Sequence, residues 1–372
     1  MWLVGGAVRD LLLGRAPARD LDLVVVGDAR PVAEALAART GGSVAYHEPF
    51  LTARVEAGDH AWDLATARRE RYPRPGSLPE VEPAPLDEDL LRRDFAVNAI
   101  AATLDGDLRT APGACEDLES GRLRVLHDAS FADDPTRLLR LVRYAARLDF
   151  AIDPPTTALA RGAIAGGALD TVTGSRIGAE LRLLLDEPRA GAALGLADQL
   201  GLLEALRPQL RWRPELAAGA RALLDVPTVL LAAAAIDADA DELRAAMDDW
   251  RFPAAERDRV VAAVRDAPAL AELLQSDPRP SAIAAAAQRS SPEAVALAGP
   301  LGDEDAARRW LDDLQHVALE IGGDDLLTAG IPPGPAIGRG LRAALNRKLD
   351  GETAGREDEL GVALEAAREP DG

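Results

Sequence analysis

A chain of 372 residues is long enough to bury a sizeable core and to form several packed modules. Its one cysteine, Cys115, excludes a disulfide within the sequence, and no apolar run approaches the ~18–20 residues that a membrane span needs. The net charge of −20 argues against a basic nucleic-acid-binding module, although the positive charge is almost all arginine, which suits forked contacts to phosphate. The first residues lack the basic stretch and cleavage site of a signal peptide, so we expect a cytoplasmic protein.

The segment 1–118 mixes strand and helix signals. Leu3-Val4 and the β-branched run Leu21–Val26 predict strands, and Pro31–Arg39 predicts a helix that Gly41-Gly42 ends. Further short strands are predicted at Ser43–Tyr46, Thr52–Ala57 and Ala61–Ala65. Pro73–Pro85 carries five prolines and one glycine, which predicts a mobile loop.

From residue 119 onward the pattern is helical. Apolar periodicity punctuated by Pro and Gly predicts helices at Pro135–Leu148, Ser175–Leu185, Glu215–Leu224, Asp241–Trp250, Ala254–Asp266 and Asp303–Leu319. The predicted fold class is therefore α+β. We expect a mixed head at 1–118, followed by a helical neck at 119–188, a helical body at 189–317 and a helical tail at 318–372.

Gly5-Gly6 stands between the first predicted strand and the start of a helix. Glycine lets the backbone approach a ligand closely, and free N–H groups at a helix start favour an anion. Arg9, on the first turn of that helix, can reach the same anion. Taken alone, the glycine pair also fits an ordinary turn, and Arg9 also fits a surface ion pair.

Asp20 and Asp22 lie two residues apart on a predicted strand, so both side chains point to one face. Mg²⁺ prefers carboxylate oxygens and commonly uses one or two of them together with substrate phosphates. Two such metals can activate an attacking hydroxyl and stabilise a leaving pyrophosphate. The alternative is that the pair decorates the exposed face of an edge strand. Asp63, on a neighbouring predicted strand, is a candidate third carboxylate.

Arg92-Arg93-Asp94 and the nearby Asn98 combine guanidiniums, a carboxylate and an amide within seven residues. A nucleotide offers matching partners, because its phosphates accept from Arg and its ribose hydroxyls bind Asp or Asn. A charged helix start with Phe95 and Val97 in the core is the alternative reading.

Asp134, Arg137, Arg140 and Arg143 recur every three residues at and along the helix predicted at Pro135–Leu148. Such a row drifts around a 3.6-residue helix but stays on one half of its surface, opposite the apolar residues. Asp134 and Arg137 offer an acceptor and donors in a fixed frame that can pair with the edge of a base. Few acids stand among the arginines, which favours an anionic ligand over an exposed face of ion pairs. A helix cap is the alternative role for Asp134.

With these four blocks in order, residues 1–185 resemble the class II tRNA nucleotidyltransferase (CCA-adding enzyme) and bacterial poly(A) polymerase family. That family belongs to the DNA polymerase beta-like nucleotidyltransferase superfamily. Gly323–Pro335 and Leu349-Asp350-Gly351 resemble the tail of bacterial tRNA nucleotidyltransferases. The resemblance implies catalytic Mg²⁺ at Asp20 and Asp22. It also implies nucleotide binding by Gly6 and Arg9 at the triphosphate, Arg93 and Asp94 at phosphate and ribose, Asp134 and Arg137 at the base, and Arg140 and Arg143 beyond them.

The activity that this resemblance implies is template-independent addition of CCA to the 3′ end of tRNA from CTP and ATP. The tRNA 3′-hydroxyl would attack the nucleotide α-phosphate and release pyrophosphate. The loop predicted at 73–88 occupies the place of a flexible family loop linked to the change from CTP to ATP, which favours full CCA addition. CC-adding, A-adding and poly(A) polymerase relatives remain alternatives, and so does a non-catalytic tRNA-binding protein on the same fold.

Two departures from the family pattern stand out. Asp133 occupies a position that is usually Glu, and Ser175 stands before Arg176 where Glu is usual, in a motif that keeps Glu180 and that we interpret as structural. None of the four histidines forms the His-Asp site of the phosphohydrolase domain that some relatives carry, so we expect no such domain.

Overall fold

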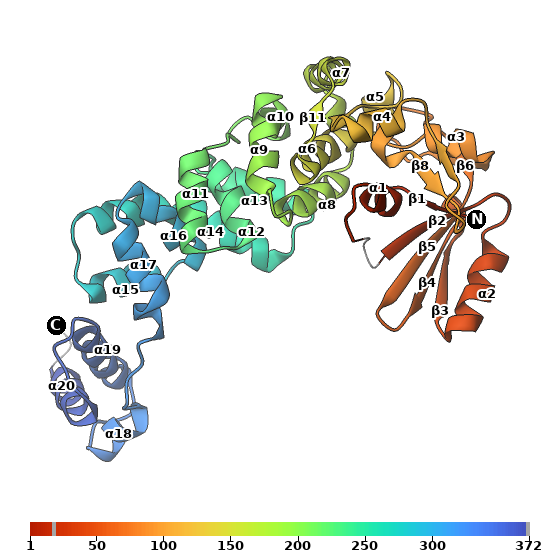
Figure 1. Ribbon diagram of the computed structural model, residues 1–372. Coiled ribbons are helices and arrows are strands. Elements are labelled where there is room, and N and C mark those ends of the chain that lie inside the picture. The colour runs from red at the N-terminus through yellow and green to blue at the C-terminus, as the bar shows by residue number, and fades with distance from the viewer. Residues whose placement is uncertain (17–19, 370–372) are drawn as a thin grey trace. The chain divides into compact units, whose positions relative to one another are not determined.

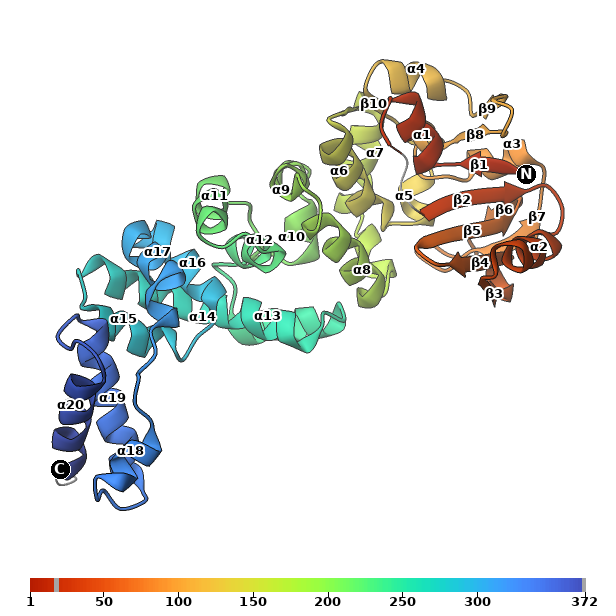
Figure 2. The same ribbon diagram turned by 60° about the horizontal axis from the view of Figure 1, so that its bottom comes forward.

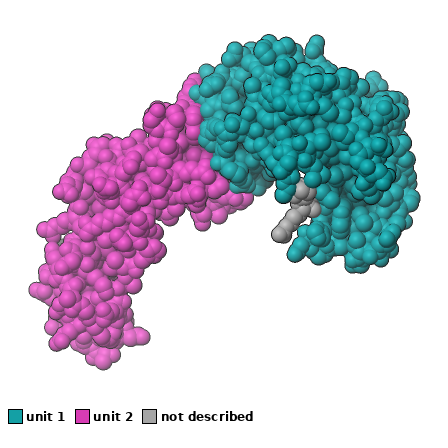
Figure 3. Space-filling view, viewed as in Figure 1, with its two compact units in different colours: residues 1–208 teal, residues 209–372 magenta. Residues whose placement is uncertain are grey.

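The structure, a computed structural model, describes residues 1–16 and 20–369, except for the side chain of Asp20. The chain forms two compact units, Met1–Pro208 and Gln209–Gly372, which Figure 3 colours separately. The division into head, neck, body and tail remains a prediction.

The first unit contains a seven-stranded sheet in the order β3-β4-β5-β2-β1-β8-β9. Its strands are β1 (Trp2–Val4), β2 (Asp20–Val25), β3 (Ser43–His47), β4 (Thr52–Ala57), β5 (His60–Thr66), β8 (Ile100–Ala102) and β9 (Leu108–Thr110). β2 and β5 are parallel, whereas each of the other neighbouring pairs is antiparallel. The strands predicted at Leu3-Val4, Leu21–Val26, Ser43–Tyr46, Thr52–Ala57 and Ala61–Ala65 are confirmed to within two residues.

The two faces of this sheet are covered by different helices (Figures 1 and 2). α2 (Arg30–Thr40) packs its alanines against Leu23 and Val25 of β2 and against β4 and β5. Val24 lies in the opposite apolar cluster, together with Leu86 and Leu90 of α3 (Leu86–Leu91). Because side chains alternate along a strand, Asp22 shares the face of Val24, away from α2. The Asp22 side chain is exposed.

The segment predicted as a mobile loop at Pro73–Pro85 is irregular as far as residue 79 and then forms a strand, so that prediction is wrong in part. β6 (Arg68–Arg71) pairs antiparallel with β7 (Glu80–Pro83), and only residues 72–79 form the tip. Opposite charges face each other across the pair, as in the ion pair between Arg69 and Glu82, 2.7 Å apart. Pro83 stands at the end of β7, where the missing N–H costs little. α3 follows at Leu86, inside the range 73–88 assigned to the loop.

The rest of the first unit is mainly helical. Its elements are η2 (Ala96–Asn98), α4 (Ala114–Glu119), β10 (Arg122–Leu123), α5 (Ser130–Asp133), α6 (Arg137–Leu148), β11 (Ala151–Ile152), α7 (Pro154–Ala165), η3 (Ala168–Thr171), α8 (Gly174–Leu185), α9 (Ala190–Gln199) and α10 (Leu202–Leu206). α1 (Gly6–Leu12) follows β1 near the N-terminus. η1 (Glu48–Phe50) lies between β3 and β4. The expected apolar side of α6 is buried, including Leu138, Leu141 and Val142.

The second unit is helical throughout its described residues. Its elements are α11 (Pro214–Leu223), α12 (Pro227–Ala234), α13 (Ala240–Asp249), α14 (Ala254–Gln275), α15 (Pro280–Ala287), α16 (Pro292–Leu301), α17 (Glu304–Asp312), η4 (Leu314–His316), α18 (Gly323–Thr328), α19 (Pro335–Leu349) and α20 (Arg356–Arg368). α14 continues through Pro268, beyond the predicted end at Asp266, because buried Leu270 and Leu274 extend its apolar face. None of the described helices is long and apolar enough to cross a membrane.

Candidate active site

A polar pocket of about 490 Å³ lies in the first unit. Its walls come from the hairpin β6–β7, from the segment after α3, and from α6 and α8, which are far apart in the sequence. It includes these predicted nucleotide-binding residues: Arg93, Asp94, Asp134, Arg137 and Arg140. It also includes residues that the sequence did not single out or that we took as structural: Arg68, Glu70, Tyr72, Arg176 and Glu180.

The glycine turn lies beside Asp22 and Arg93. Gly5 has a φ of 69°, a conformation that favours glycine, and its N–H donates to the carbonyl of Ile100 at 3.2 Å. A Cβ at Gly5 would lie 3.2 Å from Nη1 of Arg93 and 3.8 Å from Oδ2 of Asp22. The turn, one predicted metal ligand and one predicted phosphate ligand therefore meet at one point.

The strand register supports a shared carboxylate face. Asp22 of β2 pairs with Asp63 of the parallel strand β5, so their side chains leave the sheet on the same face. Oδ2 of Asp63 accepts from Nη1 of Arg54 at 2.8 Å. The backbone of Asp20 begins β2, and its side chain lies outside the described residues. Without that side chain, the described residues hold no group of three or more His, Cys, Asp or Glu placed to bind a metal. The assignment of metals to Asp20 and Asp22 stays a prediction.

Arg9 is buried and bound to protein groups. Its Nη1 donates to Oδ1 of Asn98 at 2.6 Å, and its Nε donates to Oδ1 of Asp10 at 2.9 Å. Arg9 is only 2% exposed, and a Cβ at Gly6 would lie 3.4 Å from its Nη2. The structure thus ties α1 to the segment around Asn98 through Arg9. Contact of Gly6 and Arg9 with a triphosphate stays a prediction.

Arg92 and Arg93 are both held by one carboxylate that the sequence analysis missed. Asp89 is fully buried and accepts from Nη2 of Arg92 at 2.8 Å and from Nη2 of Arg93 at 3.0 Å. Burial alone would raise the pKa of Asp89, but the two guanidiniums outweigh it and lower the pKa. Asp89 therefore stays charged and fixes both arginines at the rim of the pocket.

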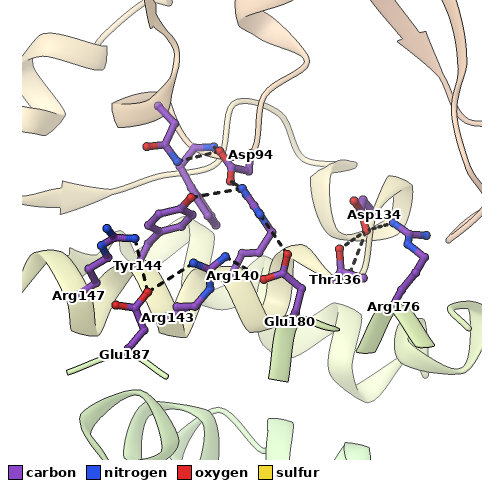
Figure 4. A network of polar contacts seen from close by, with 12 residues as sticks. Asp94, Asp134, Thr136, Arg140, Arg143, Tyr144, Arg147, Arg176, Glu180 and Glu187 are labelled. Carbon is purple, nitrogen blue, oxygen red and sulfur yellow. Dashed lines mark hydrogen bonds and ion pairs between the residues drawn. The ribbon is translucent and has the colours of Figure 1, made fainter. Parts of the chain in front are cut away.

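Asp94 is buried and joins the head segment to α6 (Figure 4). Its Oδ2 accepts from Nε and Nη2 of Arg140 at 2.9 and 2.6 Å, and its Oδ1 accepts from Asn98 at 3.0 Å. Burial would raise the pKa of Asp94, but Arg140 and Asn98 outweigh it and lower the pKa to about 2. The carboxylate is ionised at neutral pH and orients Arg140.

The arginine row of α6 is paired with acids from elsewhere in the chain, which corrects the expectation that it lacks acidic partners. Glu180 of α8 accepts from Nη1 of Arg140 at 3.1 Å and from Nη2 of Arg143 at 2.9 Å. Glu187 lies 3.5 Å from Nη1 of Arg143. The ring of Tyr144 lies within 5.4 Å of the guanidiniums of Arg9, Arg140 and Arg143. Figure 4 shows Arg140, Arg143, Tyr144, Glu180 and Glu187 as parts of one network.

Asp134 and Arg137 are fixed by several hydrogen bonds. Oδ1 of Asp134 accepts from the N–H and Oγ1 of Thr136 at 3.0 and 2.6 Å, and from Nη2 of Arg176 at 2.8 Å. Arg137 donates to Oγ of Ser130 and to the carbonyl of Arg92, both at 2.8 Å. Both residues line the pocket in fixed orientations. The signal that could have revealed Arg176 and Glu180 is their spacing of four on one predicted helix.

Residues 1–124 match the poly A polymerase head domain. The chain is 37% identical over 362 residues to a CC-adding tRNA nucleotidyltransferase of Deinococcus radiodurans, covering 96% of this chain and 87% of the relative. It is 33% identical over 404 residues to an A-adding tRNA nucleotidyltransferase of Geobacter sulfurreducens, covering 99% of this chain and 45% of the relative.

A solved structure of a Thermotoga maritima CCA-adding enzyme complexed with tRNA matches the fold with a TM-score of 0.82 and 28% identity. The match covers 98% of this chain and 90% of the other. The chain spans half or less of the length of the A-adding relatives that it matches.

Proposed function

The chain belongs to the family of bacterial tRNA nucleotidyltransferases and poly(A) polymerases, and we propose that it adds CCA to the 3′ end of tRNA from CTP and ATP. The tRNA 3′-hydroxyl attacks the nucleotide α-phosphate, and pyrophosphate leaves. The observation that carries the proposal is the pocket in which Asp94, Asp134, Arg137 and Arg140 meet beside Arg93.

The base is selected by Asp134 and Arg137. Cytosine and adenine each present an exocyclic amine, which donates, next to a ring nitrogen, which accepts; uracil and guanine present the reverse pattern. A carboxylate accepts only, and a guanidinium donates only. The contacts recorded for Asp134 fall on Oδ1, which leaves Oδ2 to accept from the amine. One carboxylate and one guanidinium can thus accept two bases and reject two.

The phosphates and ribose face the groups around Arg93. Its guanidinium lies beside the glycine turn and Asp22, and Asp89 fixes it there. Asp94 is fully engaged with Arg140, Asn98 and its own neighbour's N–H, so it acts by orienting Arg140. Arg9 positions α1 through Asn98 in the same way.

Divalent metal ions fit the carboxylate face of the sheet. Asp22 is exposed on the side away from α2, next to Gly5 and Arg93, and Asp20 precedes it on the same strand. We assign Asp20 and Asp22 as the ligands of Mg²⁺, with Asp63 as the neighbouring carboxylate in register. When bound, Mg²⁺ would lower the charge repulsion between the attacking oxygen and the triphosphate.

A second candidate function is addition of CC alone. It is favoured by the Deinococcus radiodurans relative, which is CC-adding and matches nearly the whole chain.

The test is incorporation of labelled CTP and ATP into three tRNAs, ending before CCA, after C and after CC. Full CCA addition extends all three to the same end. Arrest after CC with both nucleotides present indicates the second candidate. If none of the three tRNAs is extended, both candidate functions are overturned.

A further inference from the structure

Arg176 of α8 connects Asp134 to the tip of the hairpin β6–β7. Its Nη2 donates to Oδ1 of Asp134 at 2.8 Å, and its Nη1 donates to the carbonyl of Gly76 at 2.9 Å. The Arg176 side chain is 26% exposed and lines the pocket. The planar guanidinium of Arg176 therefore binds both Asp134 and Gly76, which lie 42 and 100 positions away from it in the sequence.

The hairpin tip is packed closely enough against its neighbours to hold the Arg176 guanidinium in place. Gly76 is buried, and its N–H donates to the carbonyl of Ala132 at 3.2 Å. Its φ is +69°, and a Cβ there would lie 2.2 Å from Oγ1 and 2.6 Å from the carbonyl oxygen of Thr171. No side chain fits at this position unless the tip moves. Gly76 is thus held by a backbone bond on one side and by Thr171 on the other.

Without Arg176, the Asp134 carboxylate has only local restraint. Its other recorded contacts come from Thr136, two residues along the chain, and both fall on the same oxygen. These contacts move with the start of α6 and do not tie the carboxylate to another part of the pocket wall. Among the described residues, the charged bond from Arg176 is the contact that reaches the Asp134 carboxylate from a distant element.

We infer that Arg176 is a positioning residue for base selection: it sets the Asp134 carboxylate, and the seating of Gly76 sets Arg176. This inference rests on the proposed function, because it assigns base selection to Asp134. It predicts that loss of Arg176 weakens discrimination among the four bases more than it slows transfer of the correct one.

The first experiment compares Arg176→Ala and Arg176→Lys with Arg189→Ala. Arg189 is matched because it also forms an ion pair with an aspartate, Asp149, at 2.7 Å, but it lies outside the pocket residues. Two quantities are measured for CTP, ATP, UTP and GTP: kcat/KM for incorporation into tRNA, and the dissociation constant of each nucleotide. We expect the preference for CTP and ATP over UTP and GTP to fall on the order of tenfold in Arg176→Ala. Lysine should restore part of it, and Arg189→Ala should leave it unchanged.

The second experiment leaves Arg176 intact and moves its anchor. Gly76→Ala forces the hairpin tip away from Thr171, whereas Gly106→Ala introduces a side chain at a φ of +95° with nothing within 4 Å. Both variants carry backbone strain, so their difference isolates the displacement of the tip. Gly76→Ala should lower the base preference in the same direction as Arg176→Ala, and Gly106→Ala should not.

Equal losses for all four nucleotides in Arg176→Ala, with the preference unchanged, would overturn the inference. So would a Gly76→Ala protein that selects bases as the unmodified chain does. If the unmodified chain extends no tRNA, the proposed function fails, while the dissociation constants still decide whether Arg176 governs the choice of base. If the unmodified chain binds all four nucleotides equally, the inference fails as well.

Discussion

Replacing Asp94 with asparagine tests the buried ion pair that joins the head segment to α6. Asparagine keeps an oxygen for Asn98, but it puts an uncharged amide against Nε and Nη2 of Arg140. The Arg140 guanidinium then remains largely buried without its strongest partner. Breaking such a pair is destabilising, because the guanidinium loses its closest acid and keeps the longer ion pair with Glu180 at 3.1 Å.

The magnitude follows from the pKa of Asp94. Its folded-state pKa of about 2 lies below the ordinary value of 3.8, so the charged form stabilises the folded state. That difference corresponds to about 2 kcal/mol of unfolding free energy at neutral pH. Because the folded pKa is lowered, the contribution is complete above the ordinary pKa and is lost as the pH falls toward about 2.

The assay is urea denaturation followed by circular dichroism, near neutral pH and at about pH 3. Asp94→Asn should unfold with about 2 kcal/mol less free energy at neutral pH, and the gap should narrow at acid pH. Asp87→Asn is the control, because Asp87 is 67% exposed and lies 3.7 Å from Arg109 on the surface. It should change stability by less than about 0.5 kcal/mol. A gap that is absent, or that is the same at both pH values, would refute the reasoning.

Three further substitutions, two of them compared with a control variant, probe other contacts of the same unit. Tyr144→Leu removes the ring that lies among three guanidiniums and should lower the free energy of unfolding by about 1–3 kcal/mol. Tyr144→Phe keeps the ring face, so its free energy of unfolding should lie within about 0.5 kcal/mol of that of the unmodified chain. Thermal denaturation measures both. Gly5 and Gly14 share a φ of +69°, so Gly5→Ala and Gly14→Ala should each lower the free energy of unfolding by about 1–2 kcal/mol. Of these two variants, Gly5→Ala crowds Arg93 and should also lower kcat in the incorporation assay. Glu180→Gln neutralises the acid between two arginines and should raise the KM for CTP about tenfold; an unchanged KM would separate that network from nucleotide binding.

Five strands of the head sheet could be predicted because each carries a local pattern, whereas the three-residue strands β8 and β9 were not predicted. Thr52–Ala57 alternates apolar and polar residues, and the structure places β4 over the same span. The order of strands could not be read in the same way. β5 pairs with β2 in parallel only after the chain has passed through α2, β3 and β4, and periodicity does not specify that crossover.

The hairpin β6–β7 was missed because proline content was taken as decisive. Its two strands pair only with each other, and such a strand tolerates Pro83 at its end. The pairing depends on opposite charges such as Arg69 and Glu82, which are 13 residues apart and carry no apolar alternation.

The candidate site was predictable where its chemistry is local and unpredictable where it is not. Asp94, Asp134 and Arg137 stand in compact blocks of charge, and the structure gathers them around one pocket. The acid that pairs with Arg140 and Arg143 is Glu180, which lies 40 and 37 positions away from them. No reading of the α6 segment alone could have shown that these arginines have buried partners.

We propose that the carboxylates of β2 catalyse nucleotidyl transfer. The most direct measurement is the single-turnover rate of CTP incorporation into a tRNA lacking CCA, for the double variant Asp20→Ala with Asp22→Ala. Asp59→Ala, at an exposed turn between β4 and β5, is the matched control. We predict a loss on the order of 10³-fold or more in the double variant, because metal charge stabilisation supplies several kcal/mol of the barrier reduction, and no change in the control. A double variant that folds and transfers CMP at the unmodified rate would contradict the account.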